Sequence, residues 1–267
     1  MKRRDFLTTA GVVGVAGMSG IEFAKAADSG NGKKYIELRT YTVANVAQKE
    51  KLIEVLDKAY IPSLNRLGIK SVGVLWTDKQ TNENNADYDL TVFMIIPHDN
   101  AESFLGYTAK LLADKQFLKD ATPILETTSK DPLYTTLKST LMIGFDKCPT
   151  VEVPTLAKDR ILQLRFYKSF NFERNAAKVH MFDEGGELPL FRKCKMNPVF
   201  FGETVFGDFM PNLTYMLGFE NEEARKAAWK AFVESDEWND IKGNPMYKDT
   251  ATSIINILLK PSKGSQI

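Results

Sequence analysis

The chain carries near its start the stretch Tyr35-Ile36-Glu37-Leu38-Arg39-Thr40-Tyr41. A second copy of the pattern follows in the other half as Ile161-Leu162-Gln163-Leu164-Arg165-Phe166-Tyr167. Apolar and polar residues alternate in both copies, which is typical of a β-strand. A strand that recurs with its surroundings indicates two copies of one larger folding unit.

The segments that follow the two strands have matching patterns. Apolar residues at helical spacing predict a helix over 52–67 in the first half, ending before Gly68. They predict a helix over 172–182 in the second half, ending at Gly185-Gly186. A pair of strands then follows in each half, at 71–76 with 90–96 and at 198–206 with 214–219, and the first pair is joined by a polar loop over 78–87.

Each half is expected to close with a second helix and a fourth strand. Asn100 and Asn221 stand where a helix begins, because Asn is a preferred N-cap residue. The closing strands are expected at 140–145 and 253–259. The predicted apolar face of the first of these helices consists of Ala101, Phe104, Leu105, Thr108, Leu111 and Leu112.

The resulting order, β-α-β-β-α-β twice, is the ferredoxin-like arrangement and places the chain in the α+β class. We expect a first domain over 34–146, a linker over 147–159 that holds Pro149 and Pro154, and a second domain over 160–261. One such unit covers only one face of its sheet with helices. We therefore expect the two sheets to face each other as a two-sheet barrel within one molecule.

Residues 1–26 have the layout of a signal peptide. Lys2, Arg3 and Arg4 precede an uncharged run from Phe6 to Ile21, and Ala24-Lys25-Ala26 then follows as a cleavage-like site. The arginine pair resembles the twin-arginine export signal, which implies a periplasmic or secreted protein. The alternative is an N-terminal membrane anchor, but the uncharged run is shorter than the roughly 20 residues that span a bilayer.

Composition excludes several classes of function. The 267-residue chain has 35 Lys+Arg against 34 Asp+Glu, a net charge of +1. The leader holds four cationic and two acidic residues, so its removal leaves 241 residues with a net charge near −1. The charge is nearly balanced, so we do not expect nucleic acid as a partner. No second apolar segment is long enough to span a membrane, so we expect no membrane contact once the leader is cleaved. Because tandem repeats can close a barrel alone, we expect a monomer or a weak homo-oligomer.

The Tyr35–Tyr41 strand resembles the opening strand of the NIPSNAP family, Tyr-x-Glu-Leu-Arg-x-Tyr. The second copy departs from this motif at Ile161 and Gln163, and the resemblance extends over about 34–145 and 160–260. Membership of this family implies the dimeric α/β-barrel fold. It implies a reaction far less firmly, because the fold hosts cofactor-free monooxygenases, haem-handling proteins and plain ligand binders.

Strand alternation separates polar from aliphatic side chains in both copies. We expect the aliphatic side to lie under the helices and the polar side to face the barrel interior. The polar side forms the candidate ligand-binding set, which consists of Glu37, Arg39, Tyr41, Gln163, Arg165 and Tyr167. In one interpretation the arginines hold an anionic or carbonyl group in a wet pocket. In the other, Glu37 neutralises Arg39 and the set only joins the two sheets.

The histidines and cysteines provide few candidates for chemistry. His98 precedes a helix and is expected at its exposed entrance, and His180 is expected to be partly exposed on a helix, three residues before Asp183. These residues have no metal-ligand spacing with Cys148 and Cys194, so no metal is predicted; His180 is the one candidate for an axial haem ligand. In an oxidising compartment the two cysteines are either paired or separate thiols.

Two functional hypotheses follow. In the first, the protein binds a small, mostly apolar molecule between its sheets and carries out cofactor-free oxidation or isomerisation; no acid-base pair is evident and no catalytic residue is predicted. In the second, it is a non-enzymatic interaction or scaffold protein with a fully packed barrel. The sequence contains no nucleotide-binding, serine-hydrolase or zinc-protease motif and predicts no cofactor.

Overall fold

The computed structural model describes residues 34–77 and 88–267. The predicted signal peptide, 1–26, and the predicted loop, 78–87, lie outside these residues. The described part of the first half contains β1 (Tyr35–Thr42), α1 (Val46–Val55), the π-helical η1 (Leu56–Tyr60), α2 (Ile61–Arg66), β2 (Gly73–Trp76), β3 (Thr91–His98), α3 (Ala101–Ala113), α4 (Lys115–Asp120), α5 (Thr122–Leu125) and β4 (Thr136–Gly144). No helix among the described residues is both long and apolar enough to cross a bilayer.

The second half repeats the order of strands and main helices. It contains β5 (Ile161–Lys168), α6 (Phe172–Asp183), α7 (Glu187–Lys193), β6 (Asn197–Phe206), β7 (Asn212–Phe219), α8 (Glu222–Val233), α9 (Asp236–Gly243), the 3-10 helix η3 (Pro245–Tyr247) and β8 (Ser253–Pro261). Asn100 and Asn221 cap α3 and α8 as expected, each accepting a hydrogen bond from the backbone N–H three residues on.

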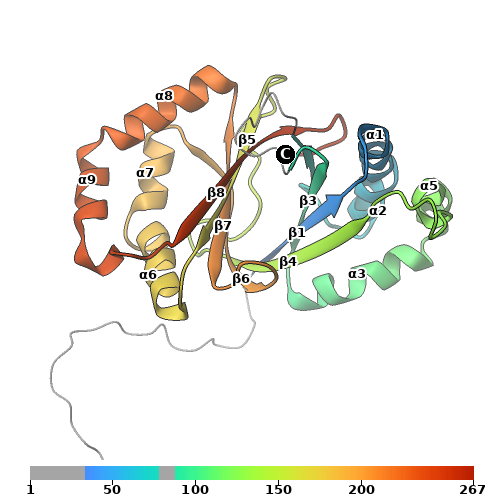
Figure 1. Cartoon of the computed structure of the whole chain (residues 1–267), viewed down its shortest axis with the longest axis horizontal. Helices are drawn as coiled ribbons and strands as arrows, with labels where there is room; N and C mark the ends of the chain where they lie inside the picture. Colours follow the sequence, from blue (N-terminus) through green and yellow to red (C-terminus); the bar gives the residue numbers. More distant parts are fainter. Residues whose placement is uncertain (1–33, 78–87) are drawn as a thin grey trace, which may run out of the picture. The chain divides into compact units, whose positions relative to one another are not determined.

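The described strands form one closed antiparallel barrel in the order β1-β3-β2-β8-β5-β7-β6-β4. Each half supplies a ferredoxin-like sheet, β4-β1-β3-β2 and β8-β5-β7-β6, and the sheets join along both edges through β2 with β8 and β4 with β6. The fold is therefore the predicted tandem arrangement, closed within one chain. The helices of the first half cover one side of the barrel and those of the second half the other (Figure 1).

Three apolar clusters fill this architecture. One receives side chains from all the described strands and from no helix, and it occupies the barrel interior; Ile36, Leu38, Leu162 and Leu164 belong to it. The other two lie between each sheet and its own helices, and Tyr41 belongs to one while Tyr167 belongs to the other. The predicted orientation of the strands was therefore wrong.

The correction has a physical reason. The wall of a closed barrel is made of strands, so side chains that point inward meet mainly other strand residues, joined here by Val151 and Ile267; all of these side chains are apolar. The polar face of β1 and β5 instead meets helices, whose tyrosine and tryptophan side chains supply hydrogen-bond partners. The polar candidates thus lie outside the barrel, under the helices.

The predicted helix over 52–67 is divided into α1, η1 and α2. The backbone N–H of Ile61 bonds to the carbonyl of Leu56, which makes a wide π-turn immediately before Pro62. A regular α-helix would bring the Pro62 ring against the carbonyl of Lys58, and the wider turn avoids this contact. The predicted apolar face of α3 was also partly wrong, because Leu105 is 76% exposed whereas Tyr107 is buried.

Candidate functional site

Glu37, the third residue of β1, is the centre of a buried polar cluster between the first sheet and α3. Its Oε1 accepts hydrogen bonds from Arg39 Nε at 2.8 Å and from Ser139 Oγ at 2.7 Å. Its Oε2 accepts from Tyr107 Oη at 2.7 Å and faces His98 Nε2 at 3.4 Å. Glu37 is 1% exposed, so each of these neighbours replaces a water molecule that an ionised carboxylate needs.

The strand register explains why these groups meet. Arg39 pairs with Ser139 across the β1–β4 ladder, which brings the Ser139 hydroxyl to the carboxylate of Glu37 two residues earlier. Glu37 pairs with Ile96 of β3, and His98 lies two residues further along β3, so its side chain is on the same side of the sheet as Glu37. Tyr107 and Ser103 are four residues apart on α3, so both face the sheet.

Arg39 connects this cluster to the surface. Besides its ion pair with Glu37, its guanidinium bonds to Tyr107 Oη and lies 3.4 Å from Tyr41 Oη. The side chain is 13% exposed, against 2% for Glu37. Burial acts to lower the pKa of Arg39, but the Tyr41, Glu37 and Tyr107 side chains raise it overall. Arg39 is therefore a fixed cation whose hydrogen bonds are already directed at protein groups.

The same neighbours keep Glu37 ionised. Burial acts to raise its pKa, but the hydrogen bond from His98, the charge of Arg39 and the hydrogen bond from Tyr107 together lower the pKa to about 2. A carboxylate in this state accepts hydrogen bonds and donates none. Glu37 is therefore an ionised hydrogen-bond acceptor at neutral pH.

The second copy of the motif forms a separate cluster against α8. Gln163 Oε1 accepts from Trp229 Nε1 at 2.6 Å, and Gln163 Nε2 donates to Asn256 Oδ1 at 2.7 Å. The guanidinium of Arg165 lies 4.7 Å from the Trp229 ring centroid and 5.2 Å from that of Tyr167. Arg165 therefore has cation–π contacts where Arg39 has an ion pair.

The six predicted site residues are thus divided between two clusters. Glu37, Arg39 and Tyr41 contact one another and α3, while Gln163, Arg165 and Tyr167 lie under the helices of the second half. The expectation of one shared site between the sheets is corrected by this division. The expectation that Glu37 pairs with Arg39 agrees with the geometry.

The histidines have different surroundings from each other. His98 was expected to be exposed, but it is 1% exposed and bonded through Nδ1 to Ser103 Oγ at 3.0 Å. His98 is the last residue of β3 and is covered by α3. The polar residues next to it in the sequence gave no sign of this burial. His180 is exposed on α6 as expected and lies 3.0 Å from Tyr247 Oη. Asp183 bonds instead to two backbone N–H groups, those of Asp146 and Lys147.

Cys148 and Cys194 are free thiols, the first buried and the second half-buried. Burial, aided by the nearby Glu152, raises the pKa of the Cys148 thiol to about 12. Within 34–77 and 88–267, no three His, Cys, Asp or Glu side chains are grouped as metal ligands.

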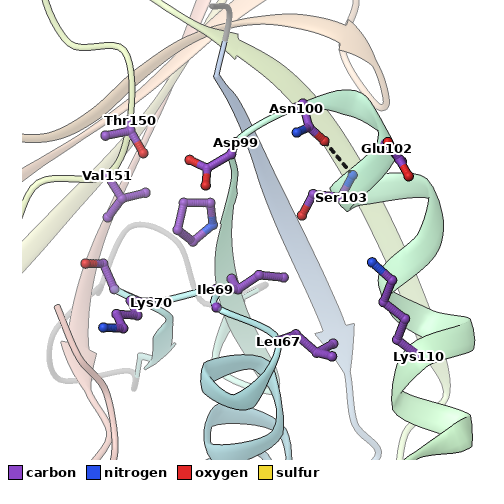
Figure 2. Close-up of a pocket in the computed structure, with 13 residues that line it drawn as sticks. Leu67, Ile69, Lys70, Asp99, Asn100, Glu102, Ser103, Lys110, Thr150 and Val151 are labelled. Atoms are coloured by element: carbon purple, nitrogen blue, oxygen red, sulfur yellow. Dashed lines mark hydrogen bonds between the residues drawn. The ribbon is translucent and has the colours of Figure 1, made fainter.

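A cavity of about 510 Å³ opens beside the Glu37 cluster. Figure 2 shows it between Leu67 and Ile69 after α2, the start of α3, and Thr150 with Val151 in the segment after β4. Ser103 stands on its wall with the hydroxyl directed to the cavity side, and its backbone N–H bonds to Asn100 Oδ1 at 2.8 Å. The remaining lining residues are Gly68, Lys70, Ser71, Pro97, Asp99, Glu102 and Lys110.

Sequence reasoning missed Tyr107 and Ser139 as partners of Glu37, and Ser103 as the partner of His98. The i, i+4 spacing of Ser103 and Tyr107 on a capped helix was a usable signal, because both must face the same way. Ser139 gave no such signal, because the sequence does not show which residue of β4 lies opposite Arg39.

These features define an α/β-barrel with a polar cluster outside the barrel, and comparison with known proteins agrees with the fold. The NIPSNAP family model matches residues 162–266. The NIPSNAP likeness is thus shown for the second half, whereas that of the first half rests on its strand motif. A search of the curated proteins finds no match.

Similar solved structures share the fold across both halves. A candidate monooxygenase from Lactobacillus acidophilus NCFM has 12% identity and a TM-score of 0.58, with 86% of this chain and 94% of that chain covered. A second candidate monooxygenase, from Fusobacterium nucleatum subsp. nucleatum, has 9% identity and a TM-score of 0.55, with 86% and 93% covered. An anthrone oxidase-like protein has 10% identity and a TM-score of 0.50, with 87% and 92% covered. At these identities the likeness shows the fold alone.

The ionisation of Glu37 predicts a specific acid sensitivity. Because its pKa is lowered from 4.5 to about 2 by folding, its contribution is complete above pH 4.5 and is lost as the pH falls toward 2. We expect the free energy of unfolding, measured by urea titration at several pH values, to lose on the order of 3 kcal/mol from this group across that window. Glu37→Gln should flatten this dependence, whereas Glu50→Gln, at an exposed position of α1, should leave it. An unchanged pH dependence in Glu37→Gln would contradict the assignment.

Proposed function

We propose that this is an exported, NIPSNAP-like protein that binds a small molecule in the cavity beside the Glu37 cluster. One observation carries the proposal: the cavity wall holds Ser103, which bonds to His98, which in turn faces the ionised Glu37. A cavity that meets a buried charged network at one point combines space for a ligand with groups that move protons.

The size and lining of the cavity support a small ligand of mixed polarity. A volume of about 510 Å³ lies in the range of roughly 300–1,000 Å³ common for ligand sites. Lys70 and Lys110 balance Asp99 and Glu102 in number, so the lining has no net charge. Leu67, Ile69 and Val151 add apolar surface. These features favour an uncharged molecule with one polar end over an anion.

The buried network supports cofactor-free chemistry. Isomerisation and oxidation without a cofactor both begin when a base removes a proton, and His98 backed by Glu37 is the candidate base. His98 is 1% exposed and reaches the cavity through Ser103, so any proton passes through the Ser103 hydroxyl. The similar monooxygenase-like folds are compatible with this class of reaction and do not select it.

The competing proposal, a non-enzymatic scaffold with a packed barrel, has support of its own. The described interior residues form one contiguous apolar cluster, and no member of the predicted ligand-binding set points into it. Both proposals therefore agree that the interior is structural, and they differ only in whether the outer cavity holds a ligand. Barrel closure within one chain also favours a monomer or a weak homo-oligomer over an obligate dimer.

Obstruction of the cavity tests ligand binding. We expect native mass spectrometry of the protein purified from its source to detect a retained small molecule. Lys70→Trp places an indole at the cavity rim and should reduce occupancy at least about 10-fold, because the ligand loses the space it fills. Lys115→Trp, at an exposed position at the start of α4, makes the same change outside the cavity and should retain the ligand. An equal occupancy in both variants, or no retained molecule in any of them, would support the scaffold instead.

Export is tested separately. Replacing Arg3 and Arg4 together by Lys should leave full-length precursor inside the cell, because the twin-arginine signal is recognised by a receptor and not by charge alone. Lys2→Arg keeps the pair and should still yield exported protein that lacks residues 1–26. Cell fractionation with intact-mass analysis measures both results, and equal export of the two variants would overturn the assignment of this leader.

A further inference from the structure

Three side chains from three elements form a linear chain of contacts that ends in the cavity. Glu37 of β1 faces His98 at the end of β3, with Oε2 and Nε2 3.4 Å apart. The other ring nitrogen of His98, Nδ1, lies 3.0 Å from Ser103 Oγ in the first turn of α3. Glu37 and His98 are buried, while Ser103 is half-buried and lines the cavity.

The charge state of Glu37 sets the direction of these hydrogen bonds. An ionised carboxylate can only accept, so Nε2 of His98 carries the proton that faces Glu37. In the neutral imidazole, Nδ1 then has a lone pair, and the hydroxyl of Ser103 donates to it. The hydroxyl proton is therefore already directed at a base, and the oxygen lone pairs of Ser103 are left toward the cavity.

Second contacts hold this arrangement in place. Tyr107 donates to the same Oε2 at 2.7 Å, and Arg39 and Ser139 hold Oε1, so the carboxylate cannot rotate away from His98. The His98 ring packs against Phe104 and Tyr107, with centroids 5.6 and 5.2 Å apart. A nucleophile, a base and an orienting carboxylate in sequence are the geometric signature of an activated hydroxyl.

We propose that Ser103 is a nucleophile for acyl transfer, activated by His98 with Glu37 as a positioning residue, and that the cavity accepts a small uncharged ester or thioester. This inference rests on the proposed ligand-binding function of the same cavity. It selects acyl transfer over isomerisation because Ser103, and not the buried His98, is the group that meets a ligand.

The steps balance with water as the second reactant. Ser103 Oγ bonds to the carbonyl carbon while its proton passes to His98 Nδ1, and the Glu37 carboxylate stabilises the resulting imidazolium. The bond from the carbonyl carbon to the leaving oxygen or sulfur then breaks, and His98 returns the proton to that atom. Water then attacks the carbonyl carbon of the acyl-serine and gives one proton to His98. The bond from that carbon to Ser103 Oγ breaks, His98 returns the proton to Oγ, and the carboxylic acid is released.

The start of α3 is suited to the charge that develops on the carbonyl oxygen. The first backbone N–H groups of a helix have no intrahelical acceptor. Asn100 Oδ1 accepts the N–H of Ser103. In the proposed step the N–H groups of Ala101 and Glu102, in the same turn, would donate to the oxyanion.

Covalent labelling tests the nucleophile directly. A fluorophosphonate transfers its phosphonyl group to an activated serine hydroxyl with loss of fluoride, and we expect peptide mass mapping to place it on Ser103 of the intact protein. His98→Gln should slow labelling by about 100-fold or more, because a general base contributes about that factor. Ser129→Ala, which removes an exposed serine remote from the cavity, should label as the wild type does. No label, or a label on any residue other than Ser103, would overturn the proposal.

A spectroscopic readout tests the role of Glu37. The chain has two histidines, so nitrogen-15 NMR resolves each imidazole, and His180→Gln assigns the signals. We expect His98 to carry its proton on Nε2 in the wild type. Glu37→Gln should change that tautomer population and slow labelling, and Glu37→Asp should partly restore both. A proton on Nδ1 in the wild type would contradict the mechanism.

A retained ligand without Ser103 labelling would overturn this inference alone, whereas labelling without a retained ligand would overturn the proposed binding function.

Discussion

The carboxylate of Glu37 is buried in a place where only a full set of hydrogen-bond donors makes its charge tolerable. Arg39, Tyr107, Ser139 and His98 supply these donors from β1, α3, β4 and β3. Because the donors come from four elements, the charge can be accommodated only when the sheet and its covering helix are correctly assembled. The placement of α3, and with it the wall of the cavity, depends on this one buried ion.

In the second half of the chain, the same architecture has an uncharged residue at the position that corresponds to Glu37. Gln163 occupies the position of Glu37 and keeps two of its contacts, with Trp229 in the place of Tyr107 and Asn256 in that of Ser139. Arg165 has no carboxylate beside it on the strand and lies instead over aromatic rings. No equivalent of the His98–Ser103 pair accompanies Gln163 among the described hydrogen bonds. The two halves thus share an architecture, while the groups suited to chemistry gather in the first.

Local patterns in the sequence were sufficient for the strands, the main helices and the repeat, but they did not predict the short helices α4, α5, α7 and α9. Alternation identified β1 and β5, and Asn100 and Asn221 marked the starts of α3 and α8, because these signals depend on neighbours along the chain. The closing strand β4 begins at Thr136, earlier than expected, because its polar first residues are held by pairing with β1 and not by burial. That pairing has no signature in the strand itself.

Local patterns did not show which face of each strand points into the barrel interior. Alternation separates Leu38 from Arg39 but does not say which side becomes the closed interior, and the aliphatic side occupies it. His98 and Tyr107 were missed for a related reason, since their value as partners arises only when α3 folds back over β1. Glu37, Arg39 and Tyr41 do contact one another, but they lie under the helices and not in the barrel interior, and their role in ligand binding stays a prediction.

Carbon-13 NMR titration of the Glu37 side-chain carboxylate, assigned with Glu37→Gln, measures the central interaction most directly. The account predicts that this carboxylate titrates near pH 2 in the folded protein, well below its ordinary value of 4.5. Titration at or above 4.5 would show that the donors around Glu37 do not hold its charge, and it would contradict both the network and the site built on it.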